Sequence, residues 1–247
     1  MKVKTILVSQ PKPESEKSAF FDLAKKYNVK IDFREFIHVE GVPASEFRKE
    51  KINLPDFTAV ILTSKNAADH YFRICNELRF TVPDTMKYYC ISESVAFYLQ
   101  KYIVYRKRKI SYGHQTVNDL VELIKKNKKE KFLLPCSDLQ SQELPDALDQ
   151  NGIDYSKAVI YRTVGSDLSD LADVNYDMLV FFSPSSITSL FKNFPDFKQN
   201  QTRIAAFGST TTQAIIDAGL TVDVPAPVPE APSMTMAIEN YIKKVNK

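Results

Sequence analysis

Short, continuously apolar stretches alternate with longer amphipathic stretches along almost the whole chain, and this alternation limits the possible folds more than any other feature. AVIL at 59–62 and MLVFF at 178–182 have no polar position, so a strand formed there must be buried on both faces. Such strands are typical of parallel sheets that are covered by helices. The alternation therefore predicts an α/β fold made of strand–helix–strand units.

The same pattern predicts the approximate positions of the elements. We expect strands at residues 5–8, 29–33, 57–63, 87–91, 102–105, 131–135, 158–164, 178–183, 203–207 and 220–224. We expect helices at residues 14–27, 67–78, 93–101, 117–127, 139–151, 187–191, 211–218 and 234–244. The segment 226–232 is rich in proline, which predicts an extended loop before the last helix.

The two halves of the chain resemble each other. The aligned pairs are FTAVILTSKNAADHYF at 57–72 with YDMLVFFSPSSITSLF at 176–191, KYYCISESVAFYL at 87–99 with RIAAFGSTTTQAI at 203–215, and VKIDFREFIHV at 29–39 with DYSKAVIYRTV at 154–164. Any two α/β halves share a general likeness, but these pairs occur in one order and at nearly constant spacing. We therefore favour a duplicated α/β unit, which would form two lobes and a ligand-binding cleft.

Composition narrows the classes of function. With 44% hydrophobic and 26% charged residues, the chain is an ordinary globular one. Its net charge of +3 is too small to indicate a nucleic-acid partner, although it suits a small anionic ligand. No apolar run is long enough to span a membrane, and the first one is too short for a signal peptide. We expect a cytoplasmic protein with no membrane partner.

The residues that commonly hold cofactors and metals are few and scattered. The six glycines form neither GxGxxG nor GxxxxGK[ST], which argues against a dinucleotide or P-loop site. The three cysteines and three histidines are widely spaced, so neither a disulfide framework nor a metal site is indicated. Cys136 could be a thiolate nucleophile at a helix start, but a small buried residue is the favoured interpretation. We expect no cofactor and no metal.

Hydroxyl side chains gather where predicted strands end and helices begin. Ligands of open α/β sheets bind at the carboxyl ends of the strands, and a helix N-terminus attracts carboxylates and phosphates. Ser and Thr are also good helix caps, which is sufficient to explain any single junction. Matched junctions in both halves favour the binding of one anionic ligand. The candidate binding residues are Thr63, Ser64, Lys65, Asn66, Ser92, Ser183, Pro184, Ser185, Gly208, Ser209, Thr210 and Thr211.

The stretches around these junctions resemble the uroporphyrinogen-III synthase family. The similarity is carried by VILTSKNA (60–67), KFLLPCSDLQSQELPDALDQNGI (131–153), AVIYRTV (158–164), LVFFSPSSI (179–187) and AAFGSTTTQAIIDAGLTVDVPAPVP (205–229). The last stretch resembles the family's Gly-x-Thr-Thr segment and the proline-containing loop that follows it. The ordered set covers nearly the whole chain and is more specific than any one motif.

The resemblance implies two flavodoxin-like α/β lobes with parallel sheets, joined by a two-stranded linker. Residues 1–37 and 166–247 would form a terminal lobe, and residues 42–161 would form a middle lobe. The hinge would then lie near 38–42 and 162–167, where the sequence has connector-like segments.

The resemblance also implies an activity. The family cyclises hydroxymethylbilane to uroporphyrinogen III, with inversion of the terminal pyrrole ring and loss of water, and needs no cofactor. Tyr161 matches the Tyr of the family's Tyr-x-Thr segment, and its phenol would assist departure of the terminal hydroxyl. The residues alone favour a packing role for this side chain, with its hydroxyl hydrogen-bonded.

The chain departs from the family pattern in the middle lobe. Ser92 and Val95 stand where Gly and Thr are common, Cys136 lies in place of the Arg of a Pro-Arg-Gly turn, and Gln142 replaces an Arg. These differences shift the expected binding toward the terminal lobe and Lys65. Asn66 fits helix capping as well as binding.

Two other functions remain open on the sequence. One is a non-catalytic, two-lobed binder of a small anionic metabolite, and the other is a diverged family member that acts as an interaction module. No long apolar heptad is present, so we expect a monomer.

Overall fold

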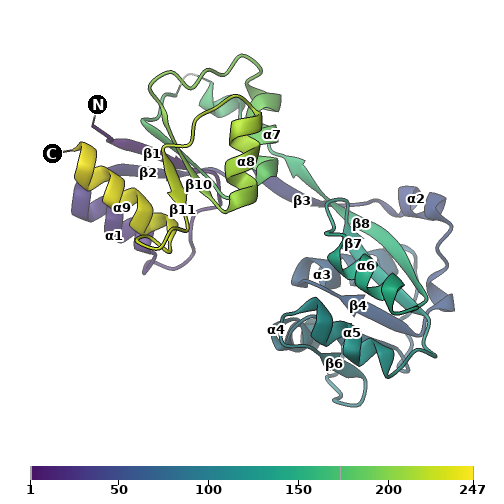
Figure 1. Cartoon of the computed structure of the whole chain (residues 1–247). Coiled ribbons are helices and arrows are strands. Elements are labelled where there is room, and N and C mark those ends of the chain that lie inside the picture. The colour runs from purple at the N-terminus through teal and green to yellow at the C-terminus, as the bar shows by residue number, and fades with distance from the viewer. Residues whose placement is uncertain (1, 173, 247) are drawn as a thin grey trace. The chain divides into compact units, whose positions relative to one another are not determined.

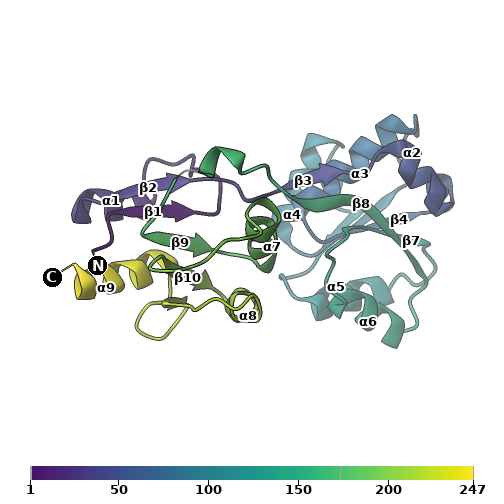
Figure 2. The same ribbon diagram turned by 90° about the horizontal axis from the view of Figure 1, so that it is seen from above.

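The computed structural model describes residues 2–172 and 174–246, and its chain divides into two compact units (Figure 1). Unit 1 consists of Met1–His38 with Val164–Lys247, and unit 2 consists of Val39–Thr163. Each unit contains one predominantly parallel sheet with helices on both faces, as Figures 1 and 2 show. The predicted α/β class is confirmed.

The sheet of unit 1 has the strand order β11-β10-β9-β1-β2, with all neighbours parallel. Counted along the chain, this is the flavodoxin-like order, in which the direction of strand addition reverses between β1 and β9. Its strands are β1 (Thr5–Val8), β2 (Lys30–Phe33), β9 (Met178–Phe181), β10 (Arg203–Phe207) and β11 (Val224–Ala226).

Two core layers enclose this sheet, because successive strand residues point to opposite faces. Val8 and Val180 pack on one face beneath α1 (Ala19–Tyr27) and α9 (Met234–Val245). Leu7 and Leu179 pack on the other face beneath α7 (Pro184–Asn193) and α8 (Ser209–Asp217). A 3-10 turn, η4 (Ser169–Leu171), adds to the second layer.

The sheet of unit 2 has the order β3-β8-β7-β4-β5-β6. Its strands are β3 (Ile37–Gly41), β4 (Ala59–Leu62), β5 (Lys87–Cys90), β6 (Ile110–Tyr112), β7 (Phe132–Ser137) and β8 (Tyr155–Gly165). The helices are α2 (Ala44–Phe47), α3 (Lys65–Glu77), α4 (Glu93–Tyr98), α5 (Val117–Lys125) and α6 (Glu143–Gln150), with 3-10 turns η1 (Arg48–Glu50), η2 (Leu54–Asp56) and η3 (Leu99–Lys101).

The apolar strand β4 shows why continuous hydrophobicity predicts a covered sheet. Val60 and Leu62 pack in the core layer beneath α3 and α4, whereas Ala59 and Ile61 pack in the opposite layer beneath α5 and α6. Both faces of the strand are covered by side chains, so a polar residue at any of these positions would be buried away from water.

The segments that align in sequence occupy equivalent places in the two sheets. β4 and β9 are central strands, with β5 and β6 beyond one and β10 and β11 beyond the other. The remaining side is filled by β7 and β8 in unit 2, but by the N-terminal strands β1 and β2 in unit 1. The repeated unit is therefore complete in both sheets, although unit 1 is assembled from both ends of the chain.

Both passages of the chain between the units fall inside strands, one in β3 and one in β8. These strands are neighbours in the sheet order. The Val42 N–H donates to the Ile160 carbonyl at 2.9 Å, and the Ser166 N–H donates to the Phe36 carbonyl at 2.9 Å.

The predicted strand at 102–105 is wrong, and β6 forms at Ile110–Tyr112 instead. The Tyr102 ring stacks on Phe72 of α3 with centroids 4.4 Å apart, and its hydroxyl donates to the Asp69 carboxylate. Tyr102 therefore packs against a helix, whereas Val104 of the same stretch is 76% exposed. The first predicted helix also begins later, at Ala19, because the Ser18 side chain caps it.

Candidate active site

The carboxyl end of β4 in unit 2 leads directly into α3. The Ser64 hydroxyl accepts a hydrogen bond from the Ala67 N–H at 3.0 Å, and the Ser92 hydroxyl accepts one from the Val95 N–H at 3.4 Å. Both serines therefore cap the helices that they precede. Thr63 is half-buried and Asn66 is exposed.

Tyr161 of β8 lies at the same edge, and its side chain is only 7% exposed. Its hydroxyl is 3.4 Å from the Ser64 hydroxyl, and its ring stacks on His70 with centroids 5.0 Å apart. Burial raises the pKa of Tyr161 above its ordinary value of 10.0. The phenol therefore keeps its proton at neutral pH.

A β-bulge aims Tyr161 at this edge. Cys136 of β7 lies opposite Val159, but Ser137 lies opposite Tyr161, which leaves Ile160 as an extra residue in β8. Consecutive residues of a regular strand point to opposite faces, yet Ile160 and Tyr161 both pack in the core layer beneath α3. The bulge therefore turns the phenol toward α3 and Ser64.

The equivalent stretch of unit 1 offers no such group. It contains Phe36, which is buried edge-on against Phe181, and Ile37. Neither side chain has a hydroxyl, so of the two equivalent positions only the one in unit 2 carries a phenol.

Lys65 adds a positive charge beside the first turn of α3. It is exposed and is the first residue of the helix, where the helix dipole disfavours a cation. Its ammonium group lies 5.4 Å from the centroid of the Tyr98 ring, which is an attractive cation–π contact. The ammonium and the helix N-terminus together suit a carboxylate.

In unit 1 the equivalent helices begin differently. Ser183 precedes α7, but its hydroxyl lies 3.0 Å from the Ser186 hydroxyl and caps no N–H of the first turn. Gly208 precedes α8 with a φ of 89°, which favours glycine, and has no side chain to cap it. Within the described residues no side chain caps either first turn, so their backbone N–H groups suit an anionic ligand.

The other predicted binders surround these two first turns. Ser209 and Thr210 are exposed, whereas Thr211 is 1% exposed. Pro184 is exposed at the first position of α7, and Ser185 is half-buried beside it.

Ser9 is a candidate that sequence reasoning missed. It follows β1 at the point where strand addition reverses, and among the described residues its hydroxyl is buried without a hydrogen-bond partner. The signal was a serine directly after an apolar stretch, as at Ser183. No predicted helix begins there, so the pattern of strand–helix junctions did not single it out.

The cysteines do not form a nucleophilic site. Cys136 is fully buried, its thiol lies 3.5 Å from the Ala158 carbonyl, and burial raises its pKa to about 11. Burial also raises the pKa of Cys75 and of Cys90 to about 12. The favoured interpretation of Cys136 as a small buried residue agrees with this setting.

Across residues 2–172 and 174–246, no group of three or more His, Cys, Asp or Glu side chains is arranged to hold a metal ion. In the same ranges, every helix is too short or too polar to cross a membrane.

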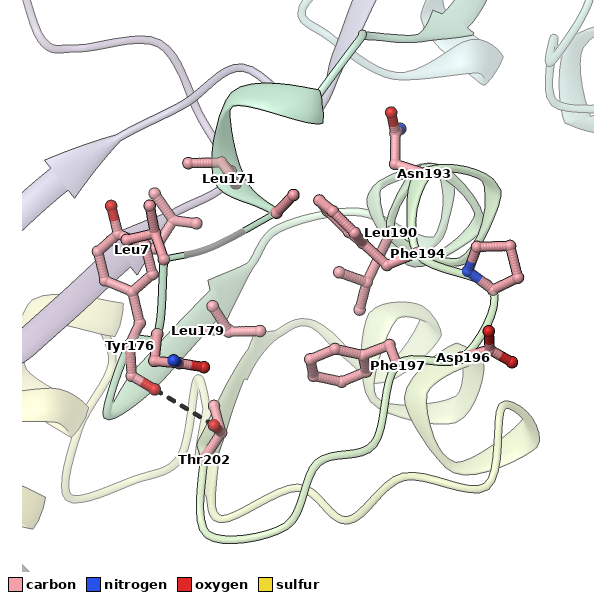
Figure 3. A pocket seen from close by; sticks show the side chains of 14 residues that line it. Leu7, Leu171, Tyr176, Leu179, Leu190, Asn193, Phe194, Asp196, Phe197 and Thr202 are labelled. Atoms are coloured by element: carbon pink, nitrogen blue, oxygen red, sulfur yellow. Dashed lines mark hydrogen bonds between the residues drawn. The ribbon is translucent and has the colours of Figure 1, made fainter.

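A cavity of about 440 Å³ in unit 1 lies apart from the predicted binding residues (Figure 3). Tyr176 and Thr202 line it, and the Thr202 hydroxyl donates to the Tyr176 carbonyl at 3.2 Å. These residues precede β9 and β10, whereas the predicted binders follow the carboxyl ends of those strands. None of the predicted site residues lines this cavity.

Arg73 of α3 links the end of β3 to the middle of β8. One guanidinium nitrogen donates to the carbonyls of Val42 and Ile160, at 2.9 Å each. Gly41 provides the room, because a Cβ at this position would lie 2.5 Å from the Arg73 Cζ.

We therefore expect Gly41→Ala to lower the free energy of unfolding by about 1–3 kcal/mol through overpacking, measured by urea denaturation. The same substitution should cost clearly less in an Arg73→Ala background, because the clashing group is then absent. Equal losses in both backgrounds would show that the guanidinium is not the neighbour that excludes a methyl group.

Comparisons with known proteins show which family the chain resembles. The profile of the family described as uroporphyrinogen-III synthase HemD matches residues 23–236. The uroporphyrinogen-III synthase of Chlorobaculum parvum is 24% identical over 262 residues, covering 98% of this chain and 100% of that protein.

Two solved structures share the fold. Uroporphyrinogen-III synthetase from Helicobacter pylori is 18% identical, with a TM-score of 0.60 and coverage of 98% of this chain and 99% of that one. A mutant uroporphyrinogen III synthase from Thermus thermophilus is 16% identical, with a TM-score of 0.55 and the same coverage. At these identities the likeness supports the two-sheet α/β fold.

Proposed function

Because the chain belongs to the uroporphyrinogen-III synthase family, we propose that Tyr161 and the uncapped helix starts of unit 1 carry out the family's reaction. The protein is a hydro-lyase of tetrapyrrole biosynthesis. Its family's substrate is hydroxymethylbilane, a linear tetrapyrrole with acetate and propionate side chains, which is closed to uroporphyrinogen III with loss of water. The alternative function is that of a non-catalytic binder of a small anion. Such a protein would not need a protonated phenol at the edge of its sheet.

Tyr161 is proposed as the general acid. The phenol donates its proton as the terminal C–O bond breaks, so the hydroxyl leaves as water, and a protonated, cationic azafulvene and a phenolate form. The substituted carbon of the last ring attacks to give a spiro intermediate, which fragments and recloses with that ring turned over. The proton is restored when the carbon that makes the final bond loses its hydrogen. The observation that carries this role is a buried, protonated phenol 3.4 Å from Ser64 at the carboxyl edge of the sheet.

The carboxylates of the substrate are proposed to bind at the first turns of α7 and α8 and beside Lys65. Hydrogen bonds from backbone N–H groups to a carboxylate contribute about 1.5–3 kcal/mol each. Hydroxymethylbilane also cyclises without an enzyme, but to the isomer whose last ring is not inverted. The binding groups therefore act chiefly by orientation, since they select which carbon reaches the azafulvene.

We also propose that the protein acts as a monomer in the cytoplasm on a small-molecule substrate. No part of the proposed site needs a nucleic acid, a membrane or a second protein.

The isomer formed from hydroxymethylbilane tests the function. We expect the protein to convert it mainly into uroporphyrinogen III, whereas a parallel reaction without protein yields the type I isomer. The two isomers are separated by chromatography after oxidation to porphyrins. Binding of the substrate with only type I product would instead support the non-catalytic binder.

A further inference from the structure

We propose that Arg73 and His70 of α3 are positioning residues that hold the Tyr161 phenol at the carboxyl edge of the unit 2 sheet. This inference rests on the proposed function of Tyr161 as the general acid. Neither residue lies at a strand end, and neither was a candidate from the sequence.

The first step concerns the bulge. Ile160 is the extra residue of the bulge, so the contacts that hold its backbone also set the position of Tyr161. The Ile160 carbonyl accepts from the Val42 N–H and from Arg73, each at 2.9 Å. Arg73 therefore anchors the backbone of the residue directly before Tyr161.

The second step concerns the ring that covers the phenol. The Arg73 Nε–H donates to Nδ1 of His70 at 3.1 Å. A guanidinium has no acceptor, so Nδ1 must be the unprotonated nitrogen and a neutral His70 carries its proton on Nε2. The imidazole lies at 17° to the Tyr161 ring. One arginine thus fixes both the bulge beneath Tyr161 and the ring stacked on it.

The third step concerns protonation. The groups around His70 are Arg73, Asp69 and Glu77 on its own helix and the Tyr161 phenol from β8. Burial, followed by the charge of Arg73, lowers the pKa of His70 below its ordinary value of 6.5, while Asp69 and Glu77 oppose this. A protonated His70 would turn an N–H toward the Arg73 Nε–H and break their bond.

The sign of the pH effect follows. The stability that neutral His70 contributes is fully present above pH 6.5 and is lost as the pH falls through its lowered pKa. Over the same range the support of Tyr161 weakens, so kcat should fall on the acid side.

Kinetics test the positioning role. We expect Arg73→Gln to lower kcat by about 10- to 100-fold with KM changed by less than about 2-fold, since the phenol is misplaced while the substrate contacts remain. In a Tyr161→Phe background the same change should lower kcat by less than about 2-fold. An equal loss in both backgrounds would overturn the proposal, because Arg73 would then act independently of the phenol.

His70 variants separate stacking from a general effect on folding. His70→Phe keeps an aromatic ring on Tyr161, so it should retain most of kcat. Because Phe does not titrate, kcat of this variant should no longer fall at acid pH through protonation of residue 70. His70→Ala should lower kcat as Arg73→Gln does. If His70→Phe and His70→Ala are equally impaired, or if both are fully active, the stacked ring does not position the phenol.

Nitrogen NMR of the histidines tests the geometry without any activity. The chain has three histidines, and the exposed His114 serves as an internal reference. We expect His70 to show an unprotonated Nδ1 and a protonated Nε2, and to titrate at a higher pH in Arg73→Gln. The opposite tautomer, or no change in that variant, would overturn the proposal even if the protein is active. A protein with the expected spectrum but no type III product would instead contradict the proposed function.

Discussion

Replacing Tyr161 with Phe is expected to lower kcat for uroporphyrinogen III formation by about 10²-fold or more, which is the range of general acid catalysis. The ring and its stacking on His70 remain, and only the hydroxyl 3.4 Å from Ser64 is lost. The free energy of unfolding should therefore change by no more than about 1 kcal/mol. Initial rates from fresh hydroxymethylbilane, with the isomers resolved, measure the effect.

Tyr155 provides a matched control for this substitution. It lies in the same strand at the opposite end, where it packs in the other core layer. Tyr155→Phe removes an equal hydroxyl and should leave kcat unchanged. Full turnover by Tyr161→Phe, or an equal loss in both variants, would remove Tyr161 from the chemistry.

Ser209→Asp is expected to raise KM by about 10- to 100-fold, corresponding to the loss of one charge-assisted hydrogen bond from a carboxylate. Ser209 is the exposed first residue of α8, whose first turn has no side-chain cap. A carboxylate at this position interacts favourably with the helix dipole, so the folded protein should be as stable or slightly more stable. Weaker binding together with undiminished stability is the diagnostic result.

Two controls isolate the cause of that change in KM. In Ser209→Asn the new side chain has the same shape as aspartate but carries no charge, so this variant should raise KM far less than Ser209→Asp does. Asn200→Asp adds the same charge at an exposed residue before β10, at the opposite end of that strand. If Asn200→Asp raises KM as much as Ser209→Asp, the effect is one of overall charge, and α8 does not bind the substrate through its first turn.

The fold follows from the sequence where burial alone decides it. AVIL becomes β4 because every side chain on both faces is covered. The duplicated segments occupy equivalent strands because the same pattern of apolar strands and amphipathic helices has the same packing solution in both sheets. Such features depend on the local pattern, which is visible in one sequence.

The site is less predictable because it depends on single hydrogen bonds. Ser64 and Ser183 both follow an apolar strand and precede a helix, yet Ser64 caps an N–H and Ser183 pairs with Ser186. The bulge at Ile160 is a shift of one residue between β7 and β8, and it leaves no periodic signal in either strand. Arg73 and His70 act on a strand distant in sequence, so their roles become visible only when the fold brings them together.

The discontinuous make-up of unit 1 has a consequence for how the chain acquires its structure during synthesis. Unit 2 is one uninterrupted segment, so it can fold as soon as it has left the ribosome. β1 must instead wait for β9, since Ile6 pairs with Met178. Pairing β1 with β9 closes a long loop, which costs conformational entropy. A folded unit 2 reduces this cost, because its two ends lie side by side in β3 and β8 and the loop that remains to be closed is shorter.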